Sequence, residues 1–330
     1  MKKLDSKSND TRTPFRGQGV HKISWLNIPG YIPETWNPII GCNHVSPGCD
    51  RCYAERMANR LASNPKTKGN YSHVIANGKW NGLTTVCYDQ VDKPLVWKKP
   101  RAIFVCSMGD LFHESVSFFD INCVFGAMSD CDQHIYIIIT KRPDRMAEFF
   151  EWKKKQCMGV TWCPKPNVWL GVTAENQEMA NHRIPILLKI PTTNRFVSIE
   201  PMLGAIDLTK IPAKFWGDQY DDLYNGISLS ALIGGSETNS PWHLNWVIVG
   251  GETGPGARPM HPDWVRSIRD QCAAAKVPFF FKQAGTSKEN AKYDWGNGEV
   301  NISLEQAYDM LVHGGGCYID SKIHHEFPKI

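Results

Sequence analysis

The sequence predicts an α/β protein, a full or partial TIM-like (β/α) barrel of parallel strands. Three observations lead to this prediction. Short apolar runs of four to seven residues recur along the chain, helical patterns separate several of them, and each run ends in polar or glycine residues. Continuous apolar runs of that length are typical of strands buried on both faces of a parallel sheet. Strands that alternate with helices indicate the α/β class, and six or seven such units suggest a barrel.

The expected elements follow one another regularly. A first strand is expected in ETWNPIIG at 34–41, and a helix is expected at 52–62. The later strand segments are AIFVCSMGD (102–110), HIYIIITKRPD (134–144), NVWLGVTAEN (167–176), NRFVSIEPM (194–202), NWVIVGGETG (245–254) and VPFFFKQAG (277–285). Further helices are predicted at 145–155 and at 262–276, the latter with Pro262 near its start.

A single barrel domain is expected over residues 22–330, behind a polar tail at 1–21. The 330 residues are enough for a sizeable core, and 42% of them are hydrophobic, which is a globular composition. The tail has basic residues without an apolar segment, so no secretory signal is predicted. No apolar run reaches the length of a membrane span. Residues 213–243 are rich in Gly, Ser and Asp and are expected to form an inserted loop over the edge of the site.

Three cysteines, Cys42, Cys49 and Cys52, lie within eleven positions. The chain has 11 cysteines, and an odd number without a signal peptide argues against a disulfide scaffold. Structural zinc takes four ligands, and His44 would complete a Cys3His set. A [4Fe–4S] cluster has four irons, so three cysteines leave one iron for a substrate or cofactor. Both interpretations are open at this stage.

A cysteine loop after the first strand of a barrel is the position expected for S-adenosylmethionine radical chemistry. There the amine and carboxylate of the methionine chelate the open iron, and one electron from the cluster yields a 5′-deoxyadenosyl radical. The spacing here is Cys-x6-Cys-x2-Cys, which is longer than the usual Cys-x3-Cys-x2-Cys of radical enzymes.

Several segments carry a resemblance that covers nearly the whole chain from residue 22 onward. They are TWNPIIGCNHVSPGCDRCYAERMA (35–58), FVCSMGDLFHE (104–114), ITKRPDRM (139–146), NVWLGVTAENQ (167–177), RIPILLKIP (183–191), RFVSIEPMLGAIDL (195–208), WVIVGGETGPGARPMHPDWVRSIRDQC (246–272) and PFFFKQAG (278–285). On these segments the chain resembles a phage and bacterial three-cysteine-motif family that is radical-SAM-like. The long cysteine spacing is that family's form of the motif. The Cys-Tyr pair at 52–53 is distantly similar to spore photoproduct lyase.

The resemblance implies that Cys42, Cys49 and Cys52 hold a [4Fe–4S] cluster and that polar strand ends hold S-adenosyl-L-methionine. The expected cofactor-binding residues are Ser107 and Asp110 at the methionine end, Thr173 and Glu175 at the ribose, and Thr140, Lys141, Gly250 and Gly251. The expected catalytic residues are Glu200, Glu252 and Lys282, which with Gln283 would face the substrate or the adenine edge.

The resemblance also favours a reaction on nucleic acid. The leading hypothesis is an isomerase or lyase that rearranges an amino-acid-adducted thymine in phage DNA hypermodification. The net charge of +4 permits such a partner, and WKKPR (97–101) and TKRPDR (140–145) would supply phosphate contacts. A cytoplasmic location, an electron donor such as flavodoxin and a partner protein encoded nearby are expected, with no membrane. One alternative is a photoproduct-lyase-like DNA repair enzyme with Cys106 or Tyr53 as hydrogen donor. Another is a non-catalytic zinc-binding phage protein.

Overall fold

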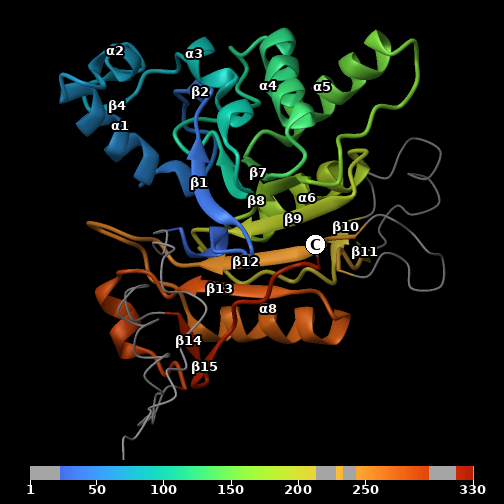
Figure 1. The fold of residues 1–330 in the computed structure, drawn as a ribbon. Coiled ribbons are helices and arrows are strands. Elements are labelled where there is room, and N and C mark those ends of the chain that lie inside the picture. Colours follow the sequence, from blue (N-terminus) through green and yellow to red (C-terminus); the bar gives the residue numbers. More distant parts are fainter. Residues whose placement is uncertain (1–22, 213–227, 233–242, 297–316, 330) are drawn as a thin grey trace, which may run out of the picture.

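Seven parallel strands form the central sheet of the protein in a computed structural model, which describes residues 23–212, 228–232, 243–296 and 317–329 (Figure 1). In order across the sheet they are β1 (Ile32–Trp36), β6 (Arg101–Val105), β7 (Ile135–Thr140), β8 (Val168–Thr173), β9 (Asn194–Ile199), β12 (Trp246–Gly250) and β13 (Phe279–Gln283). Each neighbouring pair is parallel. The order across the sheet is therefore the order along the chain. In the described residues β1 and β13 are the two edges, so the partial form of the predicted barrel is the one observed.

In the described residues, the four longer helices that follow β6, β7, β8 and β12 pack on one face of the sheet. Strands that follow each other in chain order and run parallel need crossovers of one hand, which place their helices on the same side. The longer helices are α1 (Tyr53–Ser63), α4 (Phe118–Asp130), α5 (Pro143–Gln156), α6 (Gln177–Lys189) and α8 (Pro262–Ala275). Figure 1 shows α8 lying along β13. The predicted helices at 52–62, 145–155 and 262–276 are α1, α5 and α8.

Short elements complete the described chain. They are η1 (Ser24–Leu26), β2 (Ile39–Ile40), η2 (Pro47–Cys49), α2 (Lys68–Tyr71), β3 (Ile75–Ala76), β4 (Lys79–Trp80), β5 (Thr85–Val86), α3 (Tyr88–Val91), η3 (Lys93–Val96), β10 (Ile211–Pro212), β11 (Ser228–Leu229), η5 (Lys288–Lys292), β14 (Tyr318–Ile319) and β15 (Lys322–Ile323). Most of the predicted loop at 213–243 lies outside the described residues. Its described part includes β11, which pairs antiparallel with β10.

Local signals in the sequence explain where the helices begin. The Ser117 side chain accepts from the backbone N–H of Asp120 at the start of α4, and the Asn176 side chain caps α6 in the same way. Proline is the first residue of α5 and of α8, where its missing N–H leaves no intrahelical bond unmade. The helices α5 and α6 begin directly beyond the ends of β7 and β8, so these strand ends and helix starts meet at one edge of the sheet.

The main core lies between the sheet and the helices. It is formed by alternate strand residues together with the apolar sides of α4, α5, α6 and α8, including Phe125, Phe149, Leu187 and Ile268. These side chains are at most 2% exposed. No helix in the described ranges is long and apolar enough to cross a membrane.

The opposite face of the sheet, which we call the inner face, carries an aromatic floor. Trp246 stands at its centre, with ring centroids 5.8 Å from Trp169 and 6.1 Å from Phe280. Trp25 from η1 and Phe327 from the C-terminal segment cover these rings. Side chains alternate between faces along a strand, so residues two and four positions beyond the floor lie on the same face, nearer the carboxyl edge.

Gly171 in β8 is required by this floor. A Cβ at Gly171 would lie 2.4 Å from the ring of Phe196 on the neighbouring strand. The far end of the Phe196 ring therefore occupies the space beside the glycine, and no larger residue fits without displacing it.

We expect Gly171→Ala to lower the free energy of unfolding by about 1–3 kcal/mol, the usual cost of overpacking a core. Gly126→Ala is the matched control, because Gly126 is an exposed position in α4 with no atom within 4 Å of an added Cβ. Alanine there is expected to stabilise the helix by up to about 1 kcal/mol. Urea denaturation followed by circular dichroism measures both, and equal effects of the two substitutions would contradict this account of the floor.

Candidate functional site

The three predicted metal-binding cysteines lie in one segment, residues 41–52 between β2 and α1, which we call the cysteine loop. Cys49 ends η2, and Cys52 directly precedes α1. The three thiols are not joined in disulfides. The loop begins at Gly41, where φ is +100° and a Cβ would lie 2.2 Å from the carbonyl oxygen of Leu83. Only glycine fits such a turn, so this residue determines where the loop leaves β2.

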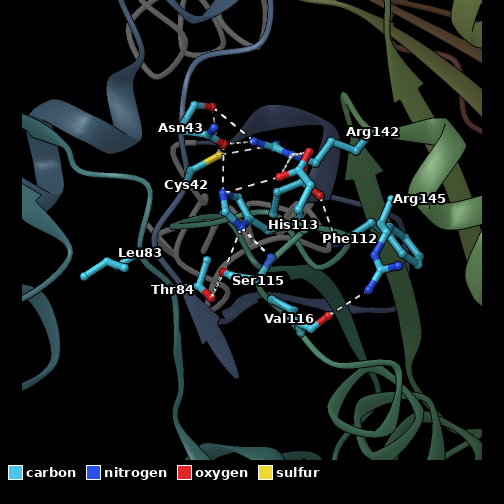
Figure 2. A network of polar contacts seen from close by, with 12 residues as sticks. Cys42, Asn43, Leu83, Thr84, Phe112, His113, Ser115, Val116, Arg142 and Arg145 are labelled. Atoms are coloured by element: carbon cyan, nitrogen blue, oxygen red, sulfur yellow. Dashed lines mark hydrogen bonds and ion pairs between the residues drawn. The ribbon is translucent and has the colours of Figure 1, made fainter.

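Arg142, between β7 and α5, makes the first set of contacts to the cysteine loop (Figure 2). Its side chain is 4% exposed. Nη1 lies 3.5 Å from Cys42 Sγ and 3.0 Å from Asp110 Oδ2. Nη2 donates to the backbone oxygen of Asn43 at 3.2 Å and also to its side-chain oxygen. Nε donates to both carboxylate oxygens of Glu114 at 3.1 Å.

Asp110 is the carboxylate that holds Arg142 in place. The Thr140 hydroxyl donates to it at 2.8 Å, and the backbone N–H groups of Phe112 and Lys141 donate at 3.0 and 3.3 Å. Three residues that the sequence assigned to cofactor binding, Asp110, Thr140 and Lys141, therefore lie together, Lys141 through its backbone N–H. Their contacts in the structure are with the protein and with each other.

The ionisation of Cys42 reflects this environment. Burial raises the pKa of the Cys42 thiol to about 12, and Asp110 raises it further, whereas Arg142 acts in the opposite direction through its charge and its hydrogen bond. A metal ion binds the thiolate, so loading this cysteine releases a proton.

Glu175 makes the second set of contacts, beyond the end of β8. One carboxylate oxygen accepts the backbone N–H of Gly48 in the cysteine loop at 3.1 Å, and the other accepts Arg183 Nη1 at 3.0 Å. Arg183 also donates to the backbone oxygen of Thr173. The Glu175 side chain is fully buried. Burial raises its pKa, but the Arg183 charge and several hydrogen bonds outweigh that effect and leave the pKa below its ordinary value.

Glu252 and Arg258 make the third set, beyond the end of β12. Arg258 donates to Glu252 from its backbone N–H at 2.9 Å and from its guanidinium at 3.0 and 2.6 Å. The same guanidinium reaches the cysteine loop, at the carbonyl oxygen of Pro47 (2.8 Å) and the carboxylate of Asp50 (3.3 Å). Arg51 Nη1 lies 3.5 Å from Glu252. Glu252 therefore holds the loop in place through Arg258. These contacts favour a structural role, and the catalytic role expected for Glu252 stays a prediction.

We refer to these three sets as the clamps on the cysteine loop: Asp110–Arg142, Glu175–Arg183 and Glu252–Arg258. They come from the ends of three different strands and contact the loop at Asn43, at Gly48 and at Pro47. The cysteine loop is thus fixed at the carboxyl edge of the sheet, where α/β barrels bind their ligands.

Glu200 and Lys282, two expected catalytic residues, form an ion pair on the inner face. Lys282 Nζ lies 3.0 Å from Glu200 Oε1, and the Ser198 hydroxyl donates to Oε2 at 3.2 Å. The side chain of Lys282 is 23% exposed and that of Glu200 is 16% exposed. Protein atoms packed around the hydroxyl of Tyr53 raise its pKa, and the nearby Cys52 and Glu200 raise it further. The pair is still reached by solvent, and the Glu200 charge acts on the hydroxyl of Tyr53, the first residue of α1.

The two glycines at the end of β12 are explained by the protein's own packing. A Cβ at Gly250 would lie 2.6 Å from Glu200 Oε1, and one at Gly251 would lie 2.1 Å from the carbonyl oxygen of Ala284. The space beside the two glycines, which was expected to admit a ligand, is therefore filled by the Glu200 carboxylate and by the loop after β13.

The remaining predicted residues lie along the same edge. The Ser107 hydroxyl donates to the side-chain oxygen of Asn37. The backbone oxygen of Ser107 accepts from the Tyr53 hydroxyl at 2.9 Å. Thr173 is buried at the end of β8. Gln283 donates weakly to the carbonyl oxygen of Gly251 at 3.4 Å. Of these residues, Thr173 is linked to the cysteine loop through the second clamp, since its carbonyl oxygen accepts from Arg183.

The two basic runs were expected to contact phosphates, but their arginines contact other protein groups. In TKRPDR, Arg142 is buried in the first clamp, and Arg145 pairs with Glu148 while its guanidinium lies over the ring of Phe118. In WKKPR both lysines are exposed, and the arginine pairs with Glu34. Arg142 was expected at a polar strand end, but its contacts with Asp110, and those of Arg183 with Glu175, were not predicted, because the sequence does not distinguish a buried arginine from a surface one.

His44, the alternative fourth metal ligand, has a partner of its own in the structure. Its Nε2 lies 3.3 Å from Glu55 Oε2, which also accepts the backbone N–H of Trp80 at 3.0 Å. Within the described residues, no three His, Cys, Asp or Glu side chains are arranged to hold a single metal ion.

The fold and the site define a singly wound α/β protein that carries a clamped cysteine loop at the carboxyl edge of its sheet. The chain belongs to the family described as "Protein of unknown function (DUF5131)", whose model matches residues 22–328. Searches of curated proteins and of solved structures found no match. The family match spans the whole sheet and all three clamps.

The second clamp generates a prediction about folding. Glu175→Gln leaves the Arg183 charge buried without its counter-charge, and breaking a buried pair in this way costs about 3–5 kcal/mol. Glu148→Gln is the control, because Glu148 pairs with Arg145 at the surface and its side chain is 61% exposed, where a pair contributes about 0–1 kcal/mol. Chemical denaturation of the metal-free protein measures both. A Glu175 variant as stable as the Glu148 variant would show that the clamp does not hold the fold.

Proposed function

We propose that the protein is a radical S-adenosylmethionine enzyme, in which Cys42, Cys49 and Cys52 hold a [4Fe–4S] cluster. One observation carries this proposal. All three thiols belong to a single loop after the first strand of a partial barrel, and clamps from three other strands fix that loop at the carboxyl edge. The clamps hold this loop although it has little regular structure of its own. A loop fixed in this way can present its three cysteines to one bound group.

The donor set fits a four-iron cluster. Thiolates are the usual ligands of such clusters, and each binds a different iron, so three cysteines leave one iron for a ligand from outside the protein. Zinc instead takes its four ligands around one point. Arg142 beside Cys42 supplies positive charge next to the thiolate, which favours an anionic group at that position.

When bound, the cluster and S-adenosylmethionine together supply a 5′-deoxyadenosyl radical for hydrogen abstraction. The chain's own residues then orient the substrate. Glu200 and Lys282 present opposite charges 3.0 Å apart on the inner face, above the aromatic floor. A substrate that carries an ammonium and a carboxylate can pair with both side chains through charge-assisted hydrogen bonds.

The substrate class that best matches this pair is a nucleobase carrying an amino acid, as in hypermodified thymine. The reaction we propose is an isomerisation of that adduct in DNA. The exposed Lys98 and Lys99 remain available to phosphates. The reductive step requires an external electron donor such as flavodoxin.

Cluster binding is tested by metal analysis after anaerobic reconstitution. The wild-type protein is expected to hold about four irons with equal sulfide, and Cys42→Ala, Cys49→Ala and Cys52→Ala are each expected to lose the reducible cluster, because no ligand is spare. Cys123→Ala in α4 and Cys272→Ala in α8 are the controls and should keep full iron. Zinc in place of iron, or a single loop variant with a full reducible cluster, would refute the assignment.

The inner-face pair is tested by separating iron content from turnover. We expect Glu200→Gln and Lys282→Gln to keep the cluster and to lose turnover of the DNA substrate by at least about tenfold, the loss expected when a charged partner is left unpaired. Nucleoside analysis of host-phage DNA with and without the protein identifies the product. A restored pair of thymines in place of a rearranged adduct would indicate a repair lyase instead.

Glu252→Gln distinguishes bracing from catalysis. Because Glu252 accepts three hydrogen bonds from Arg258, we expect this substitution to lower the thermal midpoint and the iron content together. The thermal midpoint, the iron content and 5′-deoxyadenosine formation are measured on one preparation. Full iron and a native midpoint with lost turnover would instead make Glu252 catalytic.

A further inference from the structure

Of the three cysteine sulfurs in the loop, Arg142 donates a hydrogen bond to that of Cys42. Its Nη1 donates to Cys42 Sγ at 3.5 Å. Among the described residues, the sulfurs of Cys49 and Cys52 receive no side-chain hydrogen bond. One thiol of the loop therefore has a buried cationic donor of its own.

The position of this donor is fixed from the side of the sheet. Asp110 Oδ2 accepts Arg142 Nη1 at 3.0 Å, and Thr140 contributes twice, since its hydroxyl donates to Asp110 and accepts the backbone N–H of Arg142 at 2.9 Å. Arg142, Asp110 and Thr140 are all at most 5% exposed. The guanidinium consequently has little freedom to swing away from Cys42.

The donor is also fixed from the side of the cysteine loop (Figure 2). The side-chain oxygen of Asn43 accepts from Arg142 Nη2 and lies 2.8 Å from His113 Nε2. An amide oxygen only accepts, so His113 carries its proton on Nε2. Its Nδ1 is then the acceptor for the N–H and the hydroxyl of Ser115, at 3.2 and 2.9 Å. The Ser115 hydroxyl lies 2.6 Å from that of Thr84, so the network extends from Cys42 to residues that border solvent.

We propose that Arg142 is the positioning residue of Cys42 and that, in the loaded protein, its hydrogen bond and charge raise the reduction potential of the iron–sulfur cluster; this inference rests on the proposed function. Hydrogen bonds to the ligating sulfurs and the net charge around a cluster are two of the factors that set its potential. A positive charge stabilises the reduced cluster, which carries one more electron. Partners that orient a ligand also strengthen metal binding.

Four substitutions test the inference on the reconstituted protein. Arg142→Gln removes the charge and weakens the donor, and Arg142→Lys keeps the charge without the planar fork. Glu114→Gln removes a negative charge that lies 3.1 Å from Arg142 Nε, at a side chain that is 62% exposed and tolerant of change. Arg145→Gln is the matched control, because it removes one positive charge a few residues along α5, where the partner is Glu148.

The measurements are the midpoint potential from an anaerobic redox titration and the rate of iron loss to EDTA. We expect a more negative potential and about 10- to 100-fold weaker iron retention in Arg142→Gln, in line with losses at other outer-shell partners. Arg142→Lys should fall between this variant and the wild type. Glu114→Gln should shift the potential in the positive direction, and Arg145→Gln should match the wild type.

The outcomes separate the inference from the proposed function. A wild-type protein that takes up no iron refutes the proposed function before any variant is compared. A wild-type protein with a full cluster, together with an Arg142→Gln variant of unchanged potential and iron retention, overturns the inference alone. If Arg142→Gln does not fold, Glu114→Gln decides, and a potential equal to or more negative than that of the wild type overturns the inference.

Discussion

Each clamp on the cysteine loop joins an arginine to a buried carboxylate, and neither partner of such a pair is tolerated alone in a protein interior. Two clamps reach the loop through the arginine, at the carbonyl oxygens of Asn43 and Pro47, and the third does so through a carboxylate, at the N–H of Gly48. The loop has little regular structure beyond η2. Ordering its backbone costs about 1–2 kcal/mol per residue, and charge-assisted hydrogen bonds offset that cost. The positions of the thiols therefore depend on residues remote from them in sequence.

The inner face divides into an apolar and a charged layer, and a glycine makes room in each. Gly171 admits the ring of Phe196 to the floor, and Gly250 admits the carboxylate of Glu200 above it. An ion pair placed over aromatic rings interacts more strongly than one surrounded by water. Removing either partner leaves the other mostly buried and without its counter-charge.

Apolar runs predicted the α/β class and six of the seven sheet strands, because burial on both faces leaves a continuous signal. The first strand was expected at 34–41, whereas β1 covers Ile32–Trp36, is mostly half-buried, and is followed by β2, which pairs with β5 outside the main sheet. The helices α4 and α6 were not among the predicted ones. In α6, Pro185 lies in the interior, where a proline removes a donor. The strand-end position of Asp110 and Glu175 was predicted correctly as an edge location. Their contacts could not be predicted, because a polar residue at a strand end can face a ligand or an arginine. Those arginines, Arg142 and Arg183, are brought near by the fold, and sequence spacing does not show which acid each one meets.

The order of the clamps along the chain also has a consequence for biosynthesis. The cysteine loop is made early, whereas the clamps follow at Arg142, at Arg183 and finally at Arg258. Cys52 is made about 200 residues before Arg258, an interval of about 10–40 s at typical rates of translation. During that interval the nascent chain lacks the third clamp. The cysteine loop can therefore reach its fully clamped arrangement only after the segment beyond β12 that carries Arg258 has been made.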